Sequence, residues 1–107
     1  MTSMTDRERS FENKFALDEE QKFKAEVRRN KLLGLWAAEK LGMSGDDASA
    51  YAKEVVSADF EEAGDQDVQN KVVKDLTAKG VAITAAEVRV KMDELMAAAA
   101  AQVKAGT

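Results

Sequence analysis

The chain has 107 residues, of which 34% are charged, and a net charge of −4, a length that suffices for one small domain with a single core. It contains no cysteine and no histidine, which excludes disulfide bonds, thiol chemistry and the commonest general base and transition-metal ligand. No apolar run approaches the roughly 18 residues of a membrane span, and the amino terminus lacks the apolar core of a secretory signal, so we expect a cytoplasmic protein that does not insert into a membrane and is not an enzyme.

The first predicted helix begins near Thr5, where Thr5 and Glu8 have capping-box spacing, and ends at Leu41, before a glycine. From residue 23 onward its inward positions alternate steps of four and three: Phe23, Val27, Asn30, Gly34, Ala37 and Leu41. The same stripe extended backward misses Phe11 and Phe15, which lie roughly 120° away on a helix that turns about 100° per residue. We therefore predict that residues 1–20 form a mobile amphipathic arm, partly disordered when unbound, and that residues 21–107 form the folded domain.

Three further helices follow, separated by glycines at positions 42, 45, 64 and 80. The second begins after Ser44, the third begins at Asp65, and the fourth begins after Thr84, where Glu87 completes a second capping box. Their predicted apolar faces are Ala48, Tyr51, Ala52, Val55, Val56 and Phe60, then Val68, Val72, Val73 and Leu76, then Val88, Met92, Leu95, Ala99 and Val103. Four helices with short connections predict an all-α antiparallel four-helix bundle.

Several residues carry more specific expectations about packing. Gly34 lies on the inward stripe, where it would let another backbone approach closely, and Asn30 on the same stripe needs a hydrogen-bond partner if it is buried. Leu33 and Trp36 are expected to fill the centre of the bundle. The five alanines at 97–101 favour a helix but have little to pack.

The arm is the strongest functional candidate. Phe11 and Phe15, four residues apart on one face, suit anchors in a cleft of a larger protein, while Arg7, Glu8, Arg9, Glu12 and Lys14 would orient the helix through ion pairs. The alternative is a solvated extension, or one that folds back on the bundle. Spacing alone does not decide between them.

A basic cluster, consisting of Lys22, Lys24, Arg28, Arg29 and Lys31, could bind the phosphates of a nucleotide. It lacks a glycine-rich loop, and its only interleaved aromatic residue is Phe23. A solvated helix face or a salt-bridge surface is therefore the favoured interpretation, and no nucleic-acid partner is expected.

Two stretches resemble the zeta subunit of alphaproteobacterial F-type ATP synthases: residues 6–42, DRERSFENKFALDEEQKFKAEVRRNKLLGLWAAEKLG, and residues 45–68, GDDASAYAKEVVSADFEEAGDQDV. The resemblance implies a four-helix bundle with a mobile amino-terminal segment. That segment would inhibit ATP hydrolysis, more than synthesis, by wedging between an alpha and a beta subunit beside the gamma subunit of the rotor stalk. Carried over to this chain, the inhibitory segment is Asp6, Arg7, Glu8, Arg9, Phe11, Glu12, Lys14, Phe15 and Ala16.

The resemblance also bears on partners and location. It implies a regulatory subunit, monomeric when unbound, that is peripheral to the inner membrane through the ATP synthase and needs no cofactor. Residues Arg28, Arg29, Asn30, Lys31, Leu33, Gly34 and Trp36 match the signature of the first bundle helix and are expected to be mainly structural. Some relatives are associated with ADP or ATP, so the alternative is an adenine-nucleotide-binding regulatory module without strong inhibition.

Overall fold

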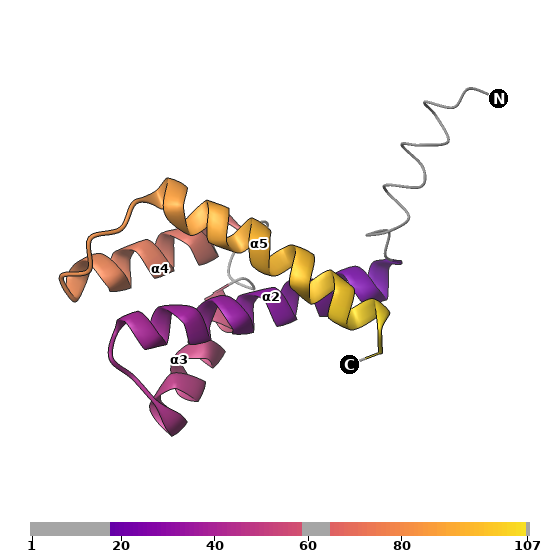
Figure 1. The fold of residues 1–107 in the computed structure, drawn as a ribbon, viewed down its shortest axis with the longest axis horizontal. Helices are drawn as coiled ribbons and strands as arrows, with labels where there is room; N and C mark the ends of the chain where they lie inside the picture. The colour runs from indigo at the N-terminus through magenta and orange to yellow at the C-terminus, as the bar shows by residue number, and fades with distance from the viewer. Residues whose placement is uncertain (1–17, 59–64, 107) are drawn as a thin grey trace.

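The computed structural model describes residues 18–58 and 65–106, which form four helices: α2 (Glu19–Lys40), α3 (Gly45–Ala58), α4 (Gln66–Ala78) and α5 (Ala85–Lys104). These described ranges contain no strand, so the all-α class and the four helices are confirmed. Helix α2 is central, because it packs against α3, α4 and α5. Helix α5 runs alongside α2 in the opposite direction, so that the last turn of α5 lies near the start of α2 (Figure 1). In the described part of the chain, no helix combines the length and apolar character needed to cross a membrane.

Helix α2 begins with a capping box that sequence analysis missed. Asp18 has an extended backbone (φ −71°, ψ 174°), and its side chain accepts a hydrogen bond of 2.7 Å from the backbone N–H of Gln21. In return, the Gln21 side chain accepts a hydrogen bond of 3.3 Å from the backbone N–H of Asp18. An extended residue cannot continue a helix, so the prediction of one continuous helix from Thr5 to Leu41 is wrong. The angle of roughly 120° between the two phenylalanines and the later stripe was calculated for one continuous helix, so it no longer applies.

The other helix ends follow the sequence signals more closely. Glu87 donates its backbone N–H to the hydroxyl of Thr84 at 3.1 Å and accepts from the backbone N–H of Thr84 at 3.3 Å, so the second predicted capping box is confirmed. Gly42 and Gly80 follow α2 and α4 with positive φ angles of 80° and 86°, which favour glycine. Asp65 precedes α4 as predicted, but its side chain makes no capping hydrogen bond.

The core lies where the four predicted apolar faces meet. Its buried members include Leu33, Ala37, Tyr51, Val55, Val68, Val72, Leu76, Val88 and Met92. Trp36 is only partly buried and packs against this cluster. Phe60 lies outside the described residues. Phe23 contradicts the predicted stripe, because 54% of the residue is exposed, whereas Ala25 and Arg29 on the same helix are buried.

Small residues let α2 and α5 each pack closely against neighbouring parts of the structure. A Cβ atom on Gly34 would lie 2.6 Å from the Cα of Ala52 on α3, which confirms the predicted close approach at this glycine. In the alanine run, Ala99 and Ala100 are buried. The prediction that this run has little to pack is therefore wrong, because two of its methyl groups belong to the packed face of α5.

Candidate functional site

The predicted inhibitory arm lies outside the described residues, so the structure gives no position for its members: Asp6, Arg7, Glu8, Arg9, Phe11, Glu12, Lys14, Phe15 and Ala16. The structure does show where the arm joins the bundle. Asp18 is both the last residue before α2 and its N-cap, so the described helix starts directly at this junction.

The helical twist of α2 separates the five residues of the predicted basic cluster. Lys22, Lys24 and Lys31 are exposed, Arg28 is half-buried, and Arg29 is buried. At about 100° per residue, Lys22 and Arg29 point to one side of α2, and the other three cations point to the opposite side. Lys24 forms an exposed ion pair of 3.2 Å with a glutamate one turn earlier on α2, and Arg28 donates a hydrogen bond of 3.3 Å to a glutamine side chain on α5.

Arg29 belongs to a polar network between three helices. Its Nη1 lies 3.4 Å from Oδ2 of Asp65, and its Nε donates to Oδ1 of Asn30 at 3.0 Å, which gives the predicted buried asparagine a partner. Only the oxygen of Asn30 is satisfied in this way, because its buried Nδ2 has no hydrogen-bond partner among the described residues. On the other side, Arg89 of α5 contacts both carboxylate oxygens of Asp65 at 2.8 and 3.1 Å. Arg89 also donates to the Gln69 side chain at 2.7 Å. The network explains why Asp65 does not cap α4, since its carboxylate faces the two arginines instead.

The hydrogen bonds from Arg89 hold the pKa of the Asp65 carboxyl below its ordinary value, by more than partial burial raises it. A depressed pKa in the folded state means that the charged carboxylate stabilises the fold. This contribution is present above the unfolded-state pKa of about 3.9 and is lost as the pH falls through the lower, folded-state pKa.

Replacing Asp65 with asparagine should therefore lower the free energy of unfolding at pH 7 by about 1 kcal/mol, because the Asp65 side chain is partly exposed and solvent screens its interaction with the arginines. The deficit should shrink as the pH falls below about 4, because the wild-type carboxyl then becomes neutral as well. Denaturant unfolding followed by the fluorescence of Trp36, the only tryptophan in the chain, measures both values. Glu39→Gln, at an exposed position of α2, is the control, and an equal deficit at both pH values would contradict the assignment.

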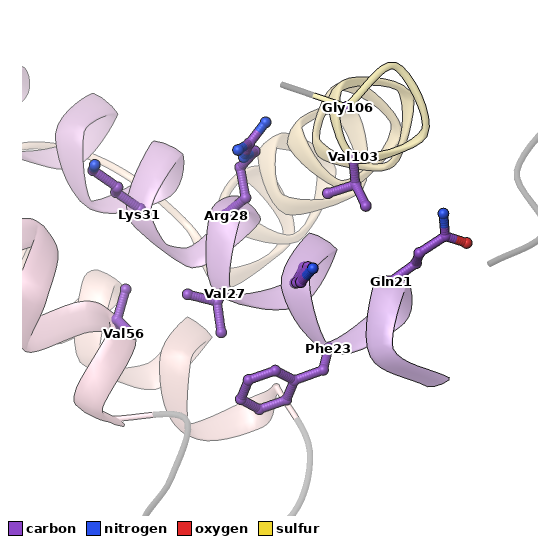
Figure 2. Close-up of a pocket in the computed structure, with 9 residues that line it drawn as sticks. Gln21, Phe23, Val27, Arg28, Lys31, Val56, Val103 and Gly106 are labelled. Atoms are coloured by element: carbon purple, nitrogen blue, oxygen red, sulfur yellow. The ribbon is translucent and has the colours of Figure 1, made fainter. Parts of the chain in front are cut away.

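Three of the predicted basic residues do meet at one surface. Lys24, Arg28 and Lys31 line a hollow of about 520 Å³, together with Phe23 and Val27 of α2 and residues from α3 and α5. Figure 2 shows Phe23 and Val27 on the side of α2 that faces Val56 of α3. Lys22 and Arg29 do not belong to this lining.

A second hollow, of about 560 Å³, continues between α2 and α3. It shares Lys31 and Val56 with the first and adds Lys53 among its lining residues. We call the two hollows together the basic groove. None of its lining residues is an aspartate or a glutamate. The contribution of α3 could not be read from the sequence, although the spacing of Phe23, Val27 and Lys31 at i, i+4 and i+8 indicates one shared face of α2.

The side chains that line this surface are of types suited to binding. Cationic side chains beside an apolar floor suit an anionic partner that also carries apolar groups. Among residues 18–58 and 65–106, no cluster of acidic side chains has the grouping needed to hold a metal ion.

Comparison with known proteins places the chain in a family. A family model described as ATPase inhibitor subunit zeta matches residues 1–102, which include the arm and all but the end of α5. The chain is also similar to a protein whose structure was solved by NMR in solution, with 60% sequence identity and a TM-score of 0.69, over 79% of this chain and 96% of that chain. A search among curated proteins gave no match. Because the family model covers nearly the whole chain, the protein belongs to the ATPase inhibitor subunit zeta family, a family of regulatory proteins rather than enzymes.

Proposed function

We propose that this protein inhibits ATP hydrolysis by the F-type ATP synthase, and that residues 6–16 do so by inserting as a helix between an alpha and a beta subunit beside the gamma subunit. The observation that carries the proposal is the family match, which begins at residue 1 and therefore includes the arm as well as the bundle. The family description names an ATPase inhibitor.

The residues of the arm suit this role. Phe11 and Phe15 provide two aromatic anchors four residues apart, a spacing that places both on one face of a helix. Aromatic anchors in a desolvated pocket carry much of the free energy of binding at protein interfaces. The neighbouring charges alternate in sign between Asp6 and Lys14, which suits ion pairs that fix the orientation of the inserted helix.

The junction at Asp18 allows the arm to act without disturbing the bundle. Because Asp18 and Gln21 cap α2 with each other's side chains, the first helix has its own start signal. In the proposal, the bundle stays outside the catalytic interface and anchors the arm, and the protein is peripheral to the membrane through the ATP synthase.

The test is a titration of the cognate ATP synthase with the full chain while the initial rate of ATP hydrolysis is followed. The rate should fall in a saturable manner as the protein is added. ATP synthesis, driven in closed vesicles by a proton gradient, should fall less at the same protein concentration. Hydrolysis that stays unchanged at a concentration where the protein demonstrably binds the enzyme would overturn the proposal.

The alternative is a regulatory module that binds an adenine nucleotide. One observation favours it: the groove places Phe23 beside Lys24, Arg28 and Lys31, an aromatic surface next to cations. Against it, Arg29 of the predicted cluster is engaged with Asp65, and the sequence contains no glycine-rich motif of the kind whose backbone N–H groups bind phosphates. Titration with ADP or ATP, followed by backbone amide chemical shifts, should show saturable changes around Lys24–Lys31 if this alternative holds.

A further inference from the structure

We infer that the basic groove is a second contact with the ATP synthase, and that its occupant is an acidic amphipathic helix on the surface of the enzyme. The inference rests on the proposed function and extends it, because it assigns a binding surface to the bundle as well as to the arm. Three properties of the groove support it: its charge, its shape and its position.

The charge of the groove is opposite to that of the whole chain. The protein has a net charge of −4, yet Lys24, Arg28, Lys31 and Lys53 line the groove and no carboxylate does. Complementary charge across an interface speeds association and selects the partner. Lys24 shares its charge with Glu20 in an exposed ion pair, but every charged residue of the lining is a cation. A basic surface on an acidic protein therefore indicates an acidic partner.

The shape of the groove suits a helix better than a small anion. Its lining on α2 extends from Gln21 to Lys31, a separation of ten residue steps that spans about 15 Å at 1.5 Å per residue. Phe23, Val27 and Val56 form an apolar floor along this length, and Phe23 is 54% exposed. An amphipathic helix presents apolar residues at i, i+4 and i+7 with charges on either side, which matches an elongated apolar floor edged with lysines.

The position of the groove brings it close to the enzyme whenever the arm is inserted. Asp18 joins the arm directly to α2, and the lining of the groove begins three residues later at Gln21, less than one helical turn away. A bundle held by its arm must therefore turn this end toward the enzyme. The groove then continues the interface that the arm makes.

The test compares two variants that change the net charge equally. The variant Lys31→Glu, Lys53→Glu reverses two exposed charges in the groove, whereas the control Lys74→Glu, Lys79→Glu reverses two exposed charges on or beside α4. Titration of ATP hydrolysis should give a half-inhibitory concentration raised about tenfold or more for the groove variant, because like charges then face each other. Full inhibition should still be reached, since the arm is intact. The control should inhibit like the wild type.

Two further measurements make the outcome decisive. For the glutamine variant Lys31→Gln, Lys53→Gln, the half-inhibitory concentration should rise less than for the glutamate variant. It should also depend less on salt than that of the wild type, because the charge attraction that salt screens has been removed. A full-length Phe11→Ala, Phe15→Ala variant should still bind the ATP synthase in sedimentation with the enzyme, and adding the groove substitutions should abolish this binding.

The failures of the two proposals can be told apart. If the wild type inhibits and the groove variant inhibits equally well, the groove is not a contact and the proposed function stands. If the wild type does not inhibit, the proposed function fails, and the sedimentation measurement alone decides whether the groove binds the enzyme. A third outcome is that ADP releases the protein from the enzyme and that the chemical-shift changes it causes in the protein are confined to the groove. This outcome would assign the surface to a nucleotide and overturn the inference.

Discussion

A chain that begins at Leu17 should lose essentially all inhibition of ATP hydrolysis and yet unfold at nearly the same temperature as the full chain. The structural reason is the cap of α2. The side chain of Asp18 accepts from the backbone of Gln21, and Gln21 returns the hydrogen bond, so the start of the helix depends on residues that the shortened chain retains. Keeping Leu17 also keeps the N–H of Asp18 as an amide, which the second hydrogen bond requires.

Point variants of the arm make the same prediction more specific. Phe11→Ala and Phe15→Ala should each raise the half-inhibitory concentration roughly 30-fold, the factor that corresponds to an interface anchor worth about 2 kcal/mol. Asn13→Ala, between the two anchors, is the matched control and should change little. The measurements are titrations of ATP hydrolysis and thermal unfolding followed by circular dichroism.

Two results would contradict this prediction in different ways. A large fall in the unfolding temperature of the shortened chain would mean that residues 1–16 pack on the bundle, so that loss of inhibition reports on stability. Retained inhibition by the shortened chain would mean that the bundle itself blocks the enzyme. In that case the basic groove is the first surface to examine.

Features that depend on neighbouring residues were predictable from the sequence. The Thr84–Glu87 capping box and the glycines that end α2 and α4 involve hydrogen bonds or backbone angles within a few residues. The Asp18–Gln21 box is equally local, and its spacing was visible. It was missed because the apolar stripe of the later helix was extended backward through it, and periodicity alone does not mark where a helix begins.

Features that depend on distant residues were not predictable. Arg29 is adjacent to Arg28 and reads as part of the same basic face, but it is turned inward toward Asp65, which lies 36 residues further along the chain. Phe23 fits the apolar period of α2 but is largely exposed, because a period identifies a face of a helix without fixing how far its neighbours cover that face. Both errors concern tertiary packing, about which the residue pattern of a single helix carries no information.

The candidate site shows the same division. Sequence placed Lys24, Arg28 and Lys31 in one cluster, and the structure brings these three together in the groove. The other wall comes from α3, which Gly34 admits to close contact with α2. Gly34 was expected to permit the close approach of another helix. The apolar stripe alone did not indicate which helix this would be.

The second large expected effect concerns Leu33 in the core. Leu33→Ala should lower the free energy of unfolding by about 2–5 kcal/mol, because it removes buried methyl groups and leaves a cavity. Leu33 is fully buried, whereas Leu35, two residues along the same helix, is 36% exposed. Leu35→Ala removes the same atoms and should cost less than about 1 kcal/mol. Denaturant unfolding followed by Trp36 fluorescence gives both values.

This pair also separates the role of the bundle from that of the arm. Small domains have a total stability of about 5–15 kcal/mol, so Leu33→Ala should lower the unfolding temperature markedly without touching the arm or the groove. Inhibition by this variant should match the wild type at a temperature where it remains folded, and should disappear on warming as the Trp36 signal reports unfolding. If inhibition persisted above that transition, the arm would need no folded bundle to act. Equal losses of stability for Leu33→Ala and Leu35→Ala would instead contradict the packing described for α2.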